Sequence, residues 1–384
     1  ECYEPRVLIW KRRKQPSPLP SFRHRFLDRE KPYTGTDILA TDLDGDGRLD
    51  VVCASWWYQN PTWERHNIPG VYQVHNAYDI DGDGRPELIA TKKSPTASNN
   101  WYEGLTCELC WLKPLDPVNG QWEEHPIGQG TGDWPHGTAI APLLPGGKPA
   151  LVTGYHSAED QGHFPEIFDV PADPKDHPWP KRILAEIPYG EEFVPYDLDG
   201  DGKLDVVAGR HWLENLGDGT FRPYQVVAEG FDNVARVRVA DVNENGRPDI
   251  IVVEESVDWN VRKAYFVRVA WFENPGDPRT VPWKVHVIDT VRCPHSLDVA
   301  DLDGDGQIEV VVGEHDPFKP YRNRCRLYVY KKADPRGRAW YRYPVDDRFE
   351  HHDGTKVFEV APGRLGIISH GWMDTHYVHL WEAY

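Results

Sequence analysis

An acidic loop at residues 42–50, with the sequence DLDGDGRLD, has the residue types of a metal site. Carboxylates at its first, third, fifth and ninth positions can converge on one cation, and its glycines permit the positive φ angles of a tight loop. Oxygen ligands of this kind suit Ca²⁺. The loop is not an EF-hand, because the closing acid stands at position nine and the flanking residues are typical of strands.

The same loop recurs at residues 79–87, 197–205, 241–249 and 301–309, with asparagines replacing two acids in the fourth copy. Five copies indicate an internal repeat, and they predict up to five structural Ca²⁺ ions. The expected ligands are Asp42, Asp44, Asp46, Asp50, Asp79, Asp81, Asp83, Glu87, Asp197, Asp199, Asp201, Asp205, Asp241, Asn243, Asn245, Asp249, Asp301, Asp303, Asp305 and Glu309.

The segments around each loop predict short strands. A first strand leads into the loop, an apolar second strand follows it, and third and fourth strands complete the unit. Residues 142–153 and 358–369 are degenerate copies, which gives seven units of roughly fifty residues, the size of a propeller blade. We therefore predict an all-β, seven-bladed β-propeller with calcium-binding turn loops, forming one domain over residues 1–384.

The two ends of the chain are expected to complete one blade. Residues 21–27 are similar to the fourth strands of later units, and residues 377–381 are similar to third strands. Pairing of these segments would close the ring and cover an exposed sheet edge.

Composition excludes several function classes. The net charge of −18 argues against a nucleic-acid partner, which needs a basic surface. No apolar run reaches the roughly eighteen residues of a membrane-spanning helix. The sequence begins at Glu1 and contains a single Met, so we expect a processed or trimmed chain. Together with the calcium loops this predicts a secreted, periplasmic or cell-surface monomer.

Histidine and charged residues recur at two positions of the repeat. His136 and His295 stand where first strands begin, whereas residues 155–156, residues 210–211 and His315 stand where second strands end. In a propeller these positions lie at one face around the central channel, so the side chains are expected to converge. A single strand-end histidine is usually only hydrogen-bonded, but several at equivalent positions indicate a functional site. A zinc site among them is an alternative, because neutral imidazoles bind Zn²⁺ well.

The DxDGDGxxD loop followed by an apolar strand resembles the FG-GAP/VCBS repeat of calcium-binding β-propellers, over nearly the whole chain. Such propellers include adhesion modules, binding proteins and enzymes, so the fold alone implies no activity. The placement of His136 and His156 in one blade, with Tyr189 and Arg210 in the next, is similar to seven-bladed polysaccharide lyases of the ulvan lyase and rhamnose-glucuronate lyase type. This resemblance implies cleavage of a uronate-containing polysaccharide or oligosaccharide.

Elimination at a uronate removes the C5 proton and expels the oxygen at C4. Under this resemblance Arg210 would neutralise the substrate carboxylate, His156 and Tyr189 would exchange the protons, and His136 would contact the substrate. Further substrate contacts are expected from Trp134, Tyr155, His211, Trp212, His295, His315 and Trp372.

Two other functions compete with the lyase. A binding propeller without catalysis needs only the fold and an aromatic mouth. A rhamnoside hydrolase would need two carboxylates at a set separation, which Glu191, Glu254, Glu255 and Glu314 could supply. The abundance of histidine and arginine at the expected mouth favours elimination.

Overall fold

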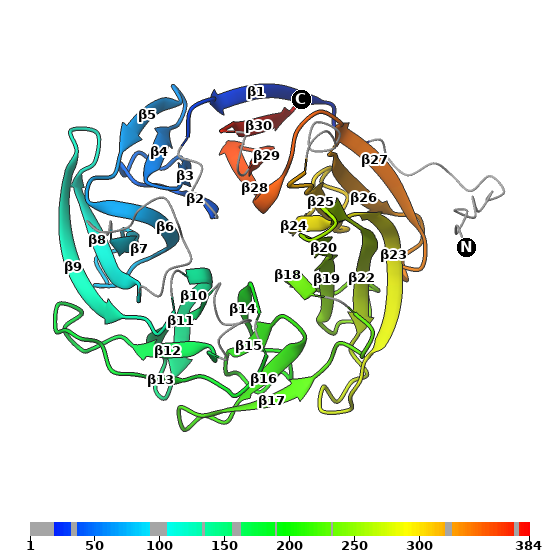
Figure 1. Ribbon diagram of the computed structural model, residues 1–384, viewed down its shortest axis with the longest axis horizontal. Helices are drawn as coiled ribbons and strands as arrows, with labels where there is room; N and C mark the ends of the chain where they lie inside the picture. The colour runs from blue at the N-terminus through cyan, green and yellow to red at the C-terminus, as the bar shows by residue number, and fades with distance from the viewer. Residues whose placement is uncertain are drawn as a thin grey trace.

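Seven four-stranded antiparallel sheets surround a central axis in the computed structural model (Figure 1). The structure describes residues 19–31, 37–92, 106–132, 135–155, 163–188, 190–231, 233–318, 325–371 and 376–384, which contain strands and turns but no helix. The seven-bladed, all-β prediction is confirmed. Trp134, His156, Tyr189 and Trp372 lie outside the described residues.

Within each blade the strands follow one another from the axis to the rim (Figure 1). The first three blades contain β2 (Ile38–Thr41), β3 (Asp50–Cys53), β4 (Trp56–Gln59) and β5 (Glu64–Asn67); β6 (Val71–Tyr78), β7 (Glu87–Lys92), β8 (Glu108–Asp116) and β9 (Gln121–Gln129); and β10 (Pro135–Leu144), β11 (Lys148–Tyr155), β12 (Glu166–Asp169) and β13 (Lys181–Ile183). The next three contain β14 (Phe193–Tyr196), β15 (Asp205–Ala208), β16 (His211–Asn215) and β17 (Phe221–Gln225); β18 (Asn233–Ala240), β19 (Asp249–Glu255), β22 (Phe266–Glu273) and β23 (Lys284–Arg292); and β24 (Pro294–Ala300), β25 (Glu309–Glu314), β26 (Leu327–Lys332) and β27 (Trp340–Asp346). The last blade contains β28 (His352–Ala361), β29 (Arg364–His370), β30 (Val378–Ala383) and β1 (Phe22–Asp28), and a two-stranded hairpin joins β20 (Val257–Asp258) to β21 (Lys263–Ala264).

Apolar second strands form the cores between blades. β3, β15 and β25 are buried along their whole length, because neighbouring blades cover both faces of each sheet. One such core packs Val52 and Trp57 of the first blade against Leu88 and Ala90 of the second. Burial of this apolar surface from water drives the blades together.

The N-terminal strand closes the ring. β1 pairs antiparallel with β30, with Phe22 opposite Ala383 and Phe26 opposite His379. Beyond this pairing, the Asp28 carboxylate accepts hydrogen bonds from Tyr58 Oη at 2.9 Å and Arg65 Nη1 at 3.2 Å. Because Tyr58 and Arg65 belong to the first blade, β1 ties the last blade to the first.

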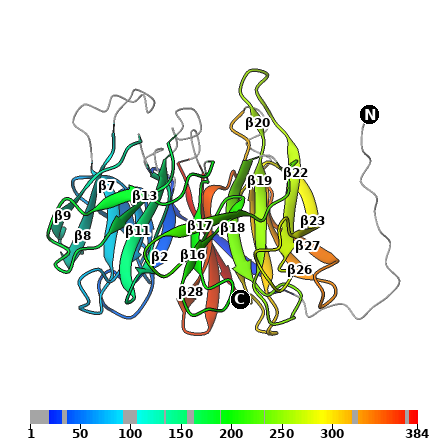
Figure 2. The same cartoon turned by 90° about the horizontal axis from the view of Figure 1, so that it is seen from below.

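The two faces of the ring carry different features. The acidic loops join first to second strands at one face, here called the loop face. The starts of β10, β24 and β28 lie at the opposite face, here called the histidine face. The hairpin of β20 projects from the histidine face, whereas the C-terminus lies toward the loop face (Figure 2).

The ninth residue of each acidic loop is a buried carboxylate, and in three loops it accepts hydrogen bonds from both the loop and the end of the third strand. Asp50 accepts hydrogen bonds from Leu43 N at 3.1 Å and from Asn60 N at 2.8 Å. Asp205 and Asp249 bond their loops in the same way. Burial raises the pKa of Asp50 to about 7, against the lowering effect of these N–H donors.

The cation position of two loops is taken by a lysine from the third strand. Lys113 Nζ contacts Asp81, lies 2.6 Å from Asp83 Oδ2 and lies 3.6 Å from Glu87 Oε1. Lys331 contacts the acids of loop 301–309 in the same way. The equivalent residue beside loop 42–50 is the neutral Gln59, whose Nε2 donates to Asp44 Oδ2 at 2.6 Å.

We propose that Ca²⁺ binds more tightly at loop 42–50, where three acidic side chains converge beside a neutral amide, than at loops 79–87 and 301–309. Lys113 and Lys331 compete with the ion at loops 79–87 and 301–309. We expect excess chelator to lower the melting temperature of the wild type, since a ligand of the folded state adds about 2.7 kcal/mol at 100 times its Kd.

The variant Lys113→Gln reproduces the Gln59 arrangement, so Ca²⁺ should raise its melting temperature by more than it raises that of the wild type. The matched control is Lys175→Gln, since Lys175 is exposed and pairs with Glu123 at 3.0 Å outside the loops. An equal Ca²⁺ response in all three proteins would contradict competition by Lys113.

We expect deletion of residues 1–30 to cause aggregation, because it exposes the edge of β30 and removes the bonds of Asp28 to the first blade. Light scattering after size exclusion measures this effect. Deletion of residues 1–18, which precede β1, should leave the protein monodisperse. A monodisperse, cooperatively unfolding protein without residues 1–30 would show that β1 is dispensable.

Candidate functional site

Irregular pairing at the starts of the inner strands builds the candidate site. Five inner strands have a register shift at this position, between Val71 and Gln73, Pro135 and Thr138, Val234 and Arg236, Pro294 and Ser296, and His352 and Thr355. A β-bulge bends the strand and redirects the inserted side chain. His136, His295 and Asp353 are inserted residues of three different blades, and they meet near the axis.

Gly137 allows β10 to approach the next blade closely. Its φ angle is +146°, and a Cβ at this position would lie 2.3 Å from the carbonyl oxygen of Glu191. Only glycine fits such a contact without displacing the backbone. This close approach brings Glu191, which precedes β14, beside His136.

A buried guanidinium crosses the centre of the site. Arg236 Nη1 donates to Glu191 Oε2 at 3.0 Å, and Arg236 Nη2 donates to Asp353 Oδ1. Arg236 also donates to backbone carbonyl oxygens of both acidic residues. Burial alone would raise the pKa of Glu191 and Asp353, but the cations beside them lower both pKa values. Both acids are therefore charged at neutral pH.

His136 lies between these two carboxylates. Its Nδ1 is 4.0 Å from Glu191 Oε2, and its Nε2 is 3.6 Å from Asp353 Oδ1. The residue is 8% exposed, more than its neighbours His295 and His315. An imidazole between carboxylates can take up and release a proton, which is the requirement for acid–base chemistry.

His295 is held by a different set of acids. Its Nε2 lies 2.8 Å from Glu191 Oε2 and 3.6 Å from Glu255 Oε2, and its Nδ1 lies 3.4 Å from Asp353 Oδ1. Burial lowers the pKa of His295, but Glu255, Glu191 and Asp353 outweigh this and raise it to about 9.

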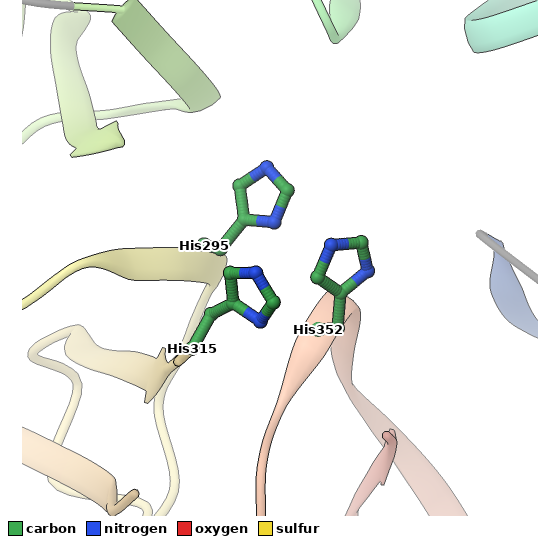
Figure 3. A group of neighbouring side chains, drawn as sticks. All are labelled: His295, His315 and His352. Carbon is green, nitrogen blue, oxygen red and sulfur yellow. The ribbon is translucent and has the colours of Figure 1, made fainter. Parts of the chain in front are cut away.

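His295, His315 and His352 form a group of three imidazoles that point toward one another (Figure 3). The ring centroids are 5.4 Å apart for His295 and His315, 4.5 Å for His295 and His352, and 4.3 Å for His315 and His352. One ligand nitrogen from each ring lies within 4.8 Å of the other two. The group is buried and is of the kind that holds a transition metal ion.

Two further groups near the site have pKa values shifted by burial. Burial lowers the pKa of His352 well below its usual value, so its imidazole is neutral. Burial also lowers the pKa of Lys31, which lies between β1 and β2, although Cys53, Glu350 and Asp353 oppose the shift. Such shifted groups concentrate at functional sites.

Arg210 lies outside this cluster. It follows β15 at the histidine face, and its Nη2 donates to the carbonyl oxygen of Ala228 at 3.0 Å. The neighbouring His211 is partly buried; desolvation and then Arg210 lower its pKa to about 4. The guanidinium among the central histidines belongs to Arg236 instead.

Two of the predicted substrate contacts lie away from the central channel. Tyr155 and Trp212 are fully buried in the cores between blades, where a ligand of the channel cannot reach them. Tyr155 Oη donates to Glu166 at 2.6 Å, and Trp212 stacks on Tyr224. His295 and His315 do lie at the expected face, but they are nearly inaccessible and touch other side chains of the site.

Sequence reasoning missed Arg236, Asp353 and Lys31. Arg236 lies one residue after Ala235, which occupies in β18 the inserted position that His136 and His295 occupy in their strands. Asp353 is likewise displaced by the irregular start of β28. The run of His351, His352 and Asp353 was the available signal, whereas nothing local marked Lys31.

A cavity of about 710 Å³ lies at the loop face, away from the histidines. It is lined by turns of three consecutive blades, including Asp81, Lys148, Arg182 and Asp218. None of the central ionisable residues lines it.

Comparisons with known proteins gave matches to a family model and to solved structures. A solved structure, the Vibrio cholerae (V. cholerae) biofilm matrix protein Bap1, aligns with 95% of this chain and 91% of its own, at 11% identity and a TM-score of 0.48. No curated protein matches the sequence significantly. The described residues include no helix that is long and apolar enough to cross a membrane. Residues 42–90 and 197–252 match the FG-GAP-like repeat, so the chain contains FG-GAP-like repeats within a seven-bladed propeller.

Proposed function

We propose that the protein cleaves an acidic, uronate-containing glycan by β-elimination at the histidine face. The observation that carries this proposal is the position of His136 between Glu191 and Asp353. Three blades contribute one member each, and all three side chains are buried. Keeping buried charges costs folding free energy, which favours a functional role for the cluster.

The chemistry of elimination suits the groups present. It requires a base for the C5 proton and an acid for the oxygen at C4, but no nucleophile. His136 is the proposed base, and the imidazolium that forms then gives its proton to the departing oxygen at C4. Asp353 and Glu191 orient the ring and stabilise this imidazolium. Positive charge from Arg236 and His295 offsets the two carboxylates, which lowers the repulsion of an anionic sugar.

Hydrolysis is less well supported, because it requires a carboxylic acid with a raised pKa. Glu191 is held charged by His295, His136 and Arg236, which lower its pKa. Glu254 is held by Arg268 Nε at 2.6 Å. Burial raises the pKa of Glu314 to about 7, but its contacts are with Arg292 and Arg326 rather than with the central histidines.

An apolar surface for sugar rings lies on the same face. The hairpin of β20 and β21 exposes Trp259 and Val261, and Phe266 at the start of β22 is exposed as well. It follows β19, whose last residue, Glu255, lies beside His295. Exposed aromatic rings next to a polar centre are suited to stacking on a glycan, and Trp259 replaces the buried Trp212 in this role.

Glycan binding without cleavage is the second candidate function. Two observations favour binding without cleavage. His136 is only slightly exposed, and the Arg210 side chain donates to the carbonyl oxygen of Ala228, so both residues have little direct access to a substrate. In this case the histidine face and its hairpin would hold the glycan, and the central cluster would only stabilise the ring.

We expect the wild type, incubated with a panel of uronate polysaccharides, to release products with the ultraviolet absorbance of an unsaturated uronate. His136→Ala should lower kcat about 10²- to 10⁴-fold, the usual contribution of a positioned acid or base. The control is His66→Ala, because His66 stacks on Trp57 at the rim of the ring. It should retain activity.

If the protein binds glycans but releases no absorbing product from any polymer, its function is glycan binding without cleavage. Full activity in a folded His136→Ala variant would remove His136 from the mechanism.

Trp259→Ala should raise KM with little change in kcat, because a stacking contact of roughly 0.5–1.5 kcal/mol binds substrate and transition state alike. Tyr384→Ala is the matched control, since Tyr384 is an exposed aromatic residue at the chain end toward the loop face (Figure 2). Equal KM values for both variants would argue against contact between the hairpin and the glycan.

A further inference from the structure

We propose that His295, His315 and His352 bind one divalent transition metal ion, with Zn²⁺ as the ion to test. The inference does not rest on glycan cleavage, because it depends only on the arrangement of these three side chains. All three are at least 95% buried, and one nitrogen of each lies within 4.8 Å of the others.

The spacing is close to that of a metal centre. Tetrahedral ligation with Zn–N bonds of about 2.0–2.1 Å places ligand nitrogens about 3.3 Å apart. The three rings come from β24, the end of β25 and the start of β28, so two neighbouring blades supply them (Figure 3). Small side-chain rotations would bring their nitrogens to the required separation.

A carboxylate contacts one ring nitrogen of every histidine in the group. Glu191 Oε2 lies 2.8 Å from His295 Nε2, and Glu350 Oε1 lies 2.7 Å from His315 Nδ1. Asp353 Oδ2 contacts His352 Nδ1. Histidines that bind metals usually have their second nitrogen held by a carboxylate or carbonyl, which fixes the tautomer and ring orientation.

The remaining nitrogen of His295 supplies an independent observation. His295 is 2% exposed, and its Nδ1 lies 3.4 Å from Asp353 Oδ1 but makes no hydrogen bond within the described residues. A buried polar atom without such a bond costs folding free energy. A metal ion at the centre of the three rings would satisfy this nitrogen.

The local charge also suits a divalent cation. Four carboxylates contact the three imidazoles, namely those of Glu191, Glu255, Glu350 and Asp353. Arg236 offsets part of this charge, and Lys31 lies near Glu350 and Asp353. A net negative charge remains, which favours a divalent cation at the three imidazoles.

The ligand type selects the class of metal. Imidazole nitrogens suit Zn²⁺, Cu²⁺ and Ni²⁺, whereas Ca²⁺ and Mg²⁺ prefer oxygen. Three protein ligands leave a coordination position for water or substrate, as in catalytic rather than structural zinc sites. The proposed metal centre is thus distinct from the acidic loops in both its place and its chemistry.

The test measures metal content of the whole chain. Chelator-treated protein is incubated with Zn²⁺ in excess Ca²⁺, which saturates the acidic loops, and is then desalted and analysed by mass spectrometry. We expect one Zn²⁺ per chain in the wild type. His315→Ala and His352→Ala should each lower Zn²⁺ affinity by more than about 100-fold, beyond the effect of losing an outer carboxylate.

Two variants of different design separate ligation from folding. Glu350→Gln removes only the outer carboxylate, and we expect about 10–100-fold weaker binding. His351→Gln should bind Zn²⁺ like the wild type, because His351 is the neighbour of His352 but contacts Ser369. With Co²⁺ in place of Zn²⁺, the wild type and His351→Gln should give the same visible absorption spectrum.

Lack of stoichiometric Zn²⁺ in the folded wild type would overturn the metal site. So would unchanged affinity in both His315→Ala and His352→Ala. A protein that cleaves glycans but binds no Zn²⁺ would overturn the metal site alone, whereas a zinc-binding protein without cleavage would overturn only the proposed lyase.

Discussion

The buried guanidinium of Arg236 is the interaction on which the centre of this propeller depends. It joins β18 to Glu191 of the preceding blade and to Asp353 of β28, across the axis of the ring. Removing one partner of such a buried pair leaves an uncompensated charge and typically costs about 3–5 kcal/mol. The arrangement of His136 and His295 depends on the same two carboxylates, so stability and the candidate site share one network.

A second tier of charges lies deeper along the same inner strands. Arg238, two residues after Arg236, pairs with Glu192 at 2.7 Å and with Asp298 at 2.9 Å. Burial alone would raise the pKa of Glu192, but Arg238 and Lys356 lower it to about 2. Alternate residues of β18 thus carry the charges that face the axis, as the period of a strand requires. The centre of the ring is polar, and apolar packing is confined to the spaces between blades.

The two faces use carboxylates for opposite purposes. At the loop face the buried acids accept hydrogen bonds from their own loops, three of them also from the third strand, and a lysine contacts the acids of two loops. At the histidine face the acids orient imidazoles and hold a guanidinium. The register shifts of β10, β24 and β28 build the second arrangement. Each shift redirects a side chain, so that His136, His295 and Asp353 meet near the axis. The acidic repeat thereby provides a rigid frame on which a distinct polar centre is built.

Local sequence determined the architecture, because each loop and the apolar strand after it lie within about a dozen consecutive residues. The number of blades and the face that carries the histidines followed from aligning those units. Only the tertiary structure decided which residues meet. Arg236 rather than Arg210 enters the centre, and Tyr155 and Trp212 are enclosed in cores. The contacts of Glu191 with His295 and of Arg236 with Asp353 span more than one hundred residues. They depend on bulges and on blade-to-blade approach, and neither leaves a periodic signal in the chain.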